Sequence, residues 1–124
     1  MPHVRLSDHP VVPGSFARMQ ALNDALGIEA FGLNAVVMDP GEDADTDHTE
    51  TDERQQEAYV VVTGHARFRV GEEQIDAPAG TVVSAPDPGA VRGYEALEPG
   101  TRIVCIGAPV SERHPDYGAW IGEG

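Results

Sequence analysis

The sequence predicts an all-β sandwich or barrel with one short helix near the N-terminus. Short apolar runs recur along the chain, and turns rich in Gly and Pro separate them. In the central stretch, residues 57–70, apolar side chains alternate at the two-residue period of a strand with one buried face. Many short strands at close intervals are typical of two packed sheets or a closed barrel.

The N-terminal part of the chain precedes the predicted strands. Residues 1–14 contain three prolines and are expected to form an extended arm. Ser15 is expected to cap a helix that runs to about Leu26 and ends at Gly27. One side of this helix carries apolar residues at helical spacing, which predicts packing against a sheet: Phe16, Met19, Leu22 and Leu26.

Residues 28–38 predict the first strand, and an acidic segment follows it. We expect one face of the strand to carry Phe31, Leu33, Ala35 and Val37. The acidic loop, residues 39–53, contains no basic residue and predicts a solvated loop. It also contains His48 and Glu50, whose two-residue spacing places both side chains on one face of an extended segment.

The central stretch predicts two strands that turn at Thr63-Gly64. Glu57, Tyr59 and Val61 share one face of the first strand, and Ala66, Phe68 and Val70 share one face of the second. A carboxylate on an otherwise apolar face is unfavourable unless another group pairs with it. The partner of Glu57 is therefore the main functional question.

Four further strands are predicted over residues 74–77, 81–85, 91–97 and 101–107. Arg92 and Tyr94 share a face of the third, and Cys105, on the fourth, is expected to be a buried thiol. Residues 111–124 form a predicted tail, in which Tyr117 and Trp120 are expected to dock on the body or on a second subunit.

Length and charge limit the classes of function. A chain of 124 residues fits one domain, and its net charge of −13 disfavours nucleic acid and anionic membranes. All eight basic residues are Arg, so Schiff-base chemistry and a P-loop are excluded. One Cys, no apolar run near the ~20 residues of a membrane span and no signal-peptide pattern predict a cytoplasmic protein.

Residues 40–94 resemble the small conserved-barrel cupins. Glu57, six residues and Gly64 match the second half of the first cupin motif, and Gly80, five residues and Pro86 match the start of the second. The resemblance implies a double-stranded β-helix, or jelly-roll barrel, over residues 28–110, with 1–27 as arm and helix and 111–124 as a tail packed on the barrel. It also implies a homodimer through the outer sheet, to which the arm could add a strand.

The metal-binding positions of the motifs are degenerate in this chain. Cupins that bind a transition metal use His, His, Glu and His, whereas here Glu57 alone stands at a ligand position and Arg92 replaces the last His. Ala96 stands where the motif has Asn. One interpretation is a three-ligand site for a divalent transition metal made of His48, Glu50 and Glu57. In the other, Arg92 pairs with Glu57 and takes the place of the metal, and we expect this second arrangement.

The leading functional prediction is therefore a barrel that binds a small polar or anionic ligand without a catalytic metal. Its expected ligand-binding residues are Tyr59, Phe68, Arg92 and Tyr94, with Arg92 holding a carboxylate or enolate-like group. Two alternatives stay open, and whether the protein is an enzyme stays open with them.

The first alternative is an enzyme, either a metal-dependent oxygenase or isomerase that uses His48, Glu50 and Glu57, or a metal-free enzyme with Glu57 and Tyr94 as acid and base. The second is a structural or partner-binding barrel whose interior is filled by side chains.

Overall fold

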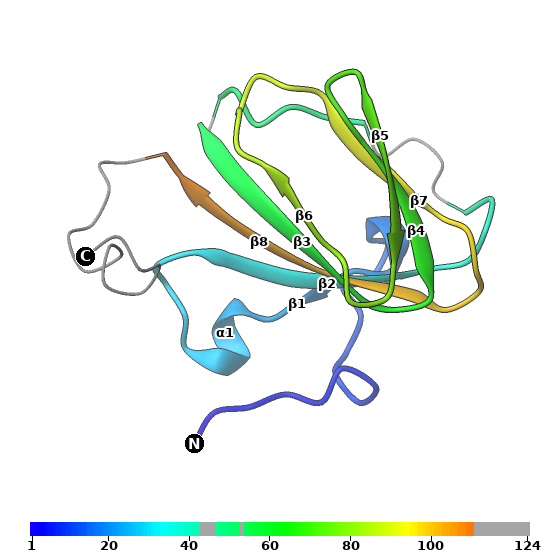
Figure 1. Cartoon of the computed structure of the whole chain (residues 1–124). Helices are drawn as coiled ribbons and strands as arrows, with labels where there is room; N and C mark the ends of the chain where they lie inside the picture. The colour runs from blue at the N-terminus through cyan, green and yellow to red at the C-terminus, as the bar shows by residue number, and fades with distance from the viewer. Residues whose placement is uncertain (43–46, 53, 111–124) are drawn as a thin grey trace, which may run out of the picture.

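Two antiparallel sheets face each other in the computed structural model, which describes residues 1–42, 47–52 and 54–110 (Figure 1). The larger sheet has the strand order β1-β2-β8-β3-β6, and the smaller has the order β5-β4-β7. The strands are β1 (Gln20–Ala21), β2 (Gly32–Met38), β3 (Gln55–Thr63), β4 (His65–Val70), β5 (Glu73–Pro78), β6 (Val82–Ala85), β7 (Arg92–Ala96) and β8 (Thr101–Pro109). The predicted all-β architecture is confirmed.

The core lies between the two sheets and contains an aromatic group from both. Tyr59 on β3, Phe68 on β4 and Tyr94 on β7 have ring centroids 5.3 to 5.6 Å apart. Val61 and Ile103 are fully buried beside them and pair across β3 and β8. The predicted inward faces of residues 57–61 and 66–70 are therefore correct at their centres, where Tyr59, Val61, Ala66 and Phe68 are buried.

The turn at Gly64 carries the chain from one sheet to the other. β3 pairs with β6 and β8, whereas β4 pairs with β5 and β7, so the two central strands do not form a hairpin. Gly64 has φ +78°, and a Cβ added there would lie 2.5 Å from Thr101 Oγ1. The crossing needs a glycine for its backbone conformation and for its close approach to β8.

The predicted helix over residues 15–26 is wrong as a single element. A 3₁₀ turn, η1 (Phe16–Arg18), is followed by β1 and then by a one-turn helix, α1 (Asn23–Leu26). Ala17 and Arg18 have φ +50° and +46°, which interrupts any helix there. A helix this short is marginal by itself, and backbone pairing of β1 with β2 replaces it. The helix does end at Gly27, which has φ +68°.

The prediction for the first strand was wrong in its start and in its face. β2 begins at Gly32, not at residue 28. Its core residues are Val36 and Met38, which lie on the face opposite to the predicted one. Ala35 is also fully buried but lies outside the core cluster, and Phe31 is 37% exposed. Because adjacent residues of this strand are buried, its apolar run carries no clear two-residue period.

The described part of the acidic loop is not simply solvated, because it pairs with β7 and the turn before it. The backbone N–H groups of His48 and Arg92 each donate to the other's carbonyl oxygen at 2.9 Å, and the Glu50 N–H donates to Pro88 O at 2.9 Å. Both His48 and Glu50 are thereby held beside the barrel.

The two ends of the chain differ in what the structure describes. The N-terminal arm contacts the barrel, since Gln20 Nε2 donates to Leu6 O at 2.7 Å and to His9 O at 2.8 Å. Residues 111–124, with the predicted docking of Tyr117 and Trp120, lie outside the described residues. In the part of the chain that the structure describes, none of the helices has the length and apolar character to cross a membrane.

We predict that Gly64→Ala lowers the free energy of unfolding more than Gly71→Ala does. Both glycines have positive φ, which costs a non-glycine residue about 1–2 kcal/mol. Only Gly64 adds a clash, with Thr101, that is expected to cost about 1–3 kcal/mol more. Urea denaturation of the two variants measures the difference, and equal loss of stability would contradict the proposed close approach.

Candidate metal and ligand site

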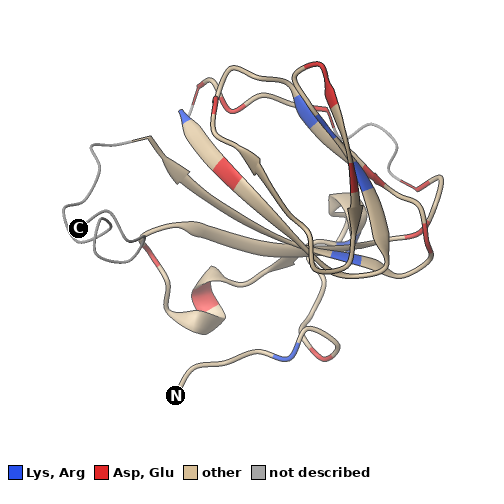
Figure 2. Cartoon of the chain, viewed as in Figure 1, with Lys and Arg blue, Asp and Glu red and all other residues tan. Residues whose placement is uncertain are grey.

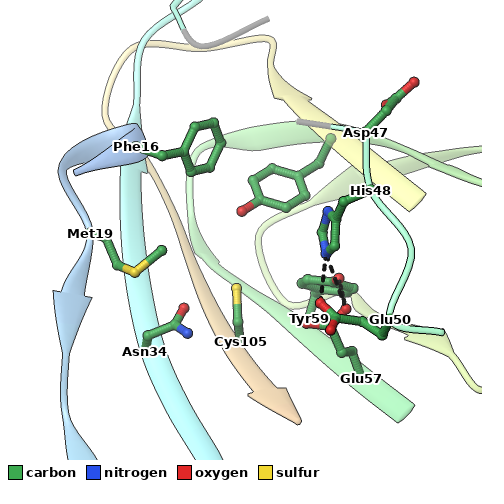
Figure 3. A pocket seen from close by; sticks show the side chains of 10 residues that line it. Phe16, Met19, Asn34, Asp47, His48, Glu50, Glu57, Tyr59 and Cys105 are labelled. Carbon is green, nitrogen blue, oxygen red and sulfur yellow. Dashed lines mark hydrogen bonds and ion pairs between the residues drawn. The ribbon is translucent and has the colours of Figure 1, made fainter. Parts of the chain in front are cut away.

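A cavity of about 340 Å³ lies between the sheets beside β3, β2 and β8 (Figure 3). Its lining combines polar groups from the acidic loop and β3 with apolar groups from η1 and the barrel wall: Phe16, Met19, Asn34, Asp47, His48, Glu50, Glu57, Tyr59, Tyr94 and Cys105. The interior is therefore not filled entirely by side chains.

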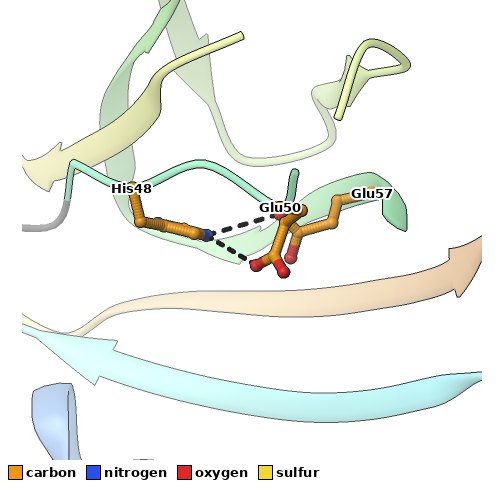
Figure 4. A group of neighbouring side chains, drawn as sticks. All are labelled: His48, Glu50 and Glu57. Carbon is orange, nitrogen blue, oxygen red and sulfur yellow. Dashed lines mark ion pairs between the residues drawn. The ribbon is translucent and has the colours of Figure 1, made fainter. Parts of the chain in front are cut away.

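Three of the lining residues converge on one point at the edge of the cavity (Figure 4). His48 Nε2 lies 3.1 Å from Glu50 Oε1 and 3.4 Å from Glu57 Oε1. One nitrogen or oxygen atom from each residue lies within 4.8 Å of the other two. Glu57 points inward because it shares the Tyr59 face of β3, and the bridge between His48 and Arg92 brings the loop to it.

Arg92 forms the predicted ion pair with Glu57. Its Nη1 donates to Glu57 Oε1 at 2.9 Å, and the Arg92 side chain is 1% exposed against 13% for Glu57. Nη2 donates to the carbonyl oxygen of Asp87, and Nε is buried without a hydrogen-bond partner among the described residues. The two arrangements that the sequence offered as alternatives, the Arg92–Glu57 pair and the His48–Glu50–Glu57 group, are thus present together.

Tyr59 is a second donor to Glu57. Its hydroxyl donates to Oε1 at 2.7 Å, and burial, with the adjacent Glu57 carboxylate, raises the pKa of Tyr59 above its ordinary value of 10. Tyr59 is therefore a neutral donor to the oxygen that also accepts from Arg92. The hydrogen bonds and ion pairs that Glu57 forms with described residues are all made through Oε1.

Charges near the cavity come from few elements (Figure 2). Glu57 is the single charged residue of β3, and β2 carries none. Asp47, on the loop, forms an ion pair with Arg69 of β4 at 2.5 Å. This contact fixes the loop next to His48 and neutralises one lining carboxylate.

The predicted ligand-binding residues divide into two groups. Tyr59 and Tyr94 line the cavity, but Phe68 and Arg92 do not. Phe68 is fully buried in the aromatic group, and the guanidinium of Arg92 lies behind Glu57. The expectation that Arg92 itself holds a ligand carboxylate is not supported by this position. Glu57 and Tyr94, the predicted metal-free acid–base pair, both line the cavity, while the hydroxyl that donates to Glu57 is that of Tyr59.

Sequence reasoning missed several lining residues. Asn34 lies on the inward face of β2, which the sequence assigned wrongly, and Phe16 and Met19 were predicted only to pack on a sheet. Cys105 was predicted to be buried, and it is 7% exposed at the cavity wall. The pairing of residues 48–50 with residues 88–92 joins an irregular loop to the start of β7 and the turn before it, and has no sequence signal.

The chain matches no protein-family model. No curated protein matches it either. Solved structures do resemble it, however. A cupin protein from Bacteroides fragilis has a TM-score of 0.64 and 15% identity, over 86% of this chain and 89% of that one.

Two further solved structures extend this likeness. A protein with a double-stranded β-helix domain from Klebsiella pneumoniae has a TM-score of 0.69, 18% identity and coverage of 88% and 90%. A predicted oxalate decarboxylase from Thermotoga maritima has a TM-score of 0.70, 19% identity and coverage of 87% and 99%. The chain therefore has a small cupin fold, a double-stranded β-helix, as its sequence motifs predict.

We predict that the thiol of Cys105 reacts very slowly in the native protein. Burial, with a smaller contribution from Glu57, raises the pKa of Cys105 to about 12, while a hydrogen bond with Tyr94 acts in the opposite direction. At pH 8 about one thiol in ten thousand would then be a thiolate. Ellman's reagent should label the unfolded chain at once and the native chain far more slowly, and rapid native labelling would contradict this burial.

Proposed function

We propose that this protein binds one divalent first-row transition metal through His48, Glu50 and Glu57 and accepts a small oxygen-donor ligand in the adjoining cavity. The observation that carries the proposal is the convergence of an imidazole nitrogen and two carboxylates within 4.8 Å, at the wall of a cavity of about 340 Å³. The cupin fold supports the proposal, because inward-facing side chains of its two sheets meet inside the barrel.

The donor set suits such an ion. Imidazole and carboxylate ligands together are typical of Fe, Mn, Ni and Zn sites, and one His with two carboxylates leaves coordination positions open. Arg92 and Tyr59 both donate to Oε1 of Glu57, which fixes the carboxylate on the barrel wall beside His48 and Glu50. A guanidinium cannot ligate a metal, so Arg92 adds no fourth ligand to His48, Glu50 and Glu57.

The remaining cavity residues determine which small ligand can bind beside the metal. A bound metal would supply Lewis-acid or redox chemistry to a ligand on its open positions. Phe16, Met19 and Cys105 form an apolar wall, while Asn34 offers a hydrogen-bonding group to orient the ligand. The predicted oxalate decarboxylase from Thermotoga maritima is consistent with a small oxygen-rich ligand, although the likeness to it is one of fold.

A metal-free binding protein is the second candidate. The ion pair of Arg92 with Glu57 favours it, since a buried cation already balances the carboxylate. In that case His48, Glu50 and Asn34, rather than Arg92, supply the polar contacts to a small ligand. The two candidates differ in whether the protein needs a metal to bind its ligand.

We expect isothermal titration of chelator-treated protein with Mn²⁺ or Zn²⁺ to show about one site per chain. His48→Ala and Glu50→Gln should each weaken binding by a factor on the order of 100, because even outer-shell partners of a metal contribute 10- to 100-fold. Both positions are partly exposed, so the variants should fold.

His65→Ala is the matched control, because His65 pairs with Asp76 at 2.5 Å outside the cavity. It should leave the metal affinity unchanged. If none of Mn²⁺, Fe²⁺, Ni²⁺ and Zn²⁺ binds the wild-type protein at stoichiometric level, the metal proposal is wrong and the metal-free candidate takes its place.

A further inference from the structure

Arginine residues pair with two of the three carboxylates that line the cavity. Asp47 pairs with Arg69 at 2.5 Å, and Glu57 pairs with Arg92 at 2.9 Å, while Glu50 contacts His48. The Asp47 pair is half exposed, but the Arg92 guanidinium is 1% exposed. Arg92 therefore places a permanent charge inside the barrel, since arginine stays protonated in proteins.

The charge of the site follows from these groups. With a neutral imidazole, two carboxylates and the guanidinium leave the site with one negative charge. A divalent ion would reverse this to one positive charge. Tyr59 and Cys105 add no charge to the site, because burial raises the pKa of both and keeps their O–H and S–H groups protonated.

The negative charge of the whole chain does not cancel this local effect. The chain carries −13, but among the described residues most carboxylates lie in loops, and β5 and β7 carry Glu73, Asp76 and Glu95 (Figure 2). Exposed charges are screened by salt beyond roughly 8–10 Å, whereas a buried charge next to the site is screened much less. A divalent ion would offset the two carboxylates Glu50 and Glu57, and the buried charge of Arg92 would then leave the site positive.

We infer that the metal-loaded site selects a small anion, such as a carboxylate, over a neutral ligand of the same shape, and that the charge of Arg92 sets this preference without touching the ligand. This inference rests on the proposed metal binding. It names the ligand class of that site, and it assigns Arg92 two positioning tasks. The Arg92 side chain holds Oε1 of Glu57, and its backbone holds His48.

Acetate and acetamide are the matched probes, because they have nearly the same size and differ in charge. Mn²⁺-loaded protein is titrated with each, and loss of metal-bound water is followed by water proton relaxation. We expect acetate to bind about tenfold or more tightly than acetamide, the effect of one unit charge at close range in a protein. Without metal, acetate should show no saturable binding by calorimetry.

Three variants test the role of Arg92. Arg92→Met keeps an apolar stem of similar length and should reduce the acetate preference about tenfold, while Arg92→Lys keeps the charge and should preserve most of it. Arg67→Met is the control, since Arg67 pairs with Glu95 away from the cavity at 3.3 Å. Thermal melting checks that each variant is folded, and Arg92→Gln, which is also neutral but can still hydrogen-bond, is used if Arg92→Met does not fold.

The outcomes separate the two proposals. Failure of Mn²⁺ to bind the wild-type protein overturns the metal site and this inference together. Metal binding with equal affinity for acetate and acetamide, or saturable acetate binding without metal, overturns the inference alone. Retention of the full acetate preference in folded Arg92→Met would show that another group supplies the charge.

Discussion

The ion pair between Glu57 and Arg92 is the interaction on which the organisation of the site depends. Burying a guanidinium costs several kcal/mol unless an anion and hydrogen bonds compensate it, and Glu57 and the carbonyl of Asp87 do so here. The backbone of the same residue pairs with His48. One residue of β7 therefore connects β3, the turn before β7 and the acidic loop.

This connection explains how a degenerate motif still yields a compact group of ligating atoms. The described part of the acidic loop lies along residues 88–92, which brings His48 and Glu50 close to Glu57. The salt bridge of Asp47 with Arg69 holds the same loop from the side of β4. Arg92 thus replaces a metal-binding imidazole in position while organising the three groups that remain.

The sequence predicted the fold and the position of Glu57 in the site, but not the residues that β2 and the acidic loop contribute. The physical reason differs from one element to the next. Glu57, Tyr59 and Val61 alternate on a strand with one buried face, so their inward position could be predicted, and the partner of Glu57 followed from motif position. In β2 adjacent residues are buried, so Asn34 was missed. The inward position of His48 could not be predicted because it depends on long-range backbone pairing, and Phe68 was placed at the cavity because pattern alone cannot distinguish a lining residue from a packed one.

The place of β8 in the larger sheet has a consequence for synthesis of the chain. β8 is the last described strand, yet it lies between β2 and β3 and pairs with both along most of its length (Figure 1). Until residue 109 has left the ribosome, β2 and β3 both lack this partner. A nascent chain that has not yet released β8 therefore exposes two apolar strand edges, which makes this the interval in which a chaperone would protect it.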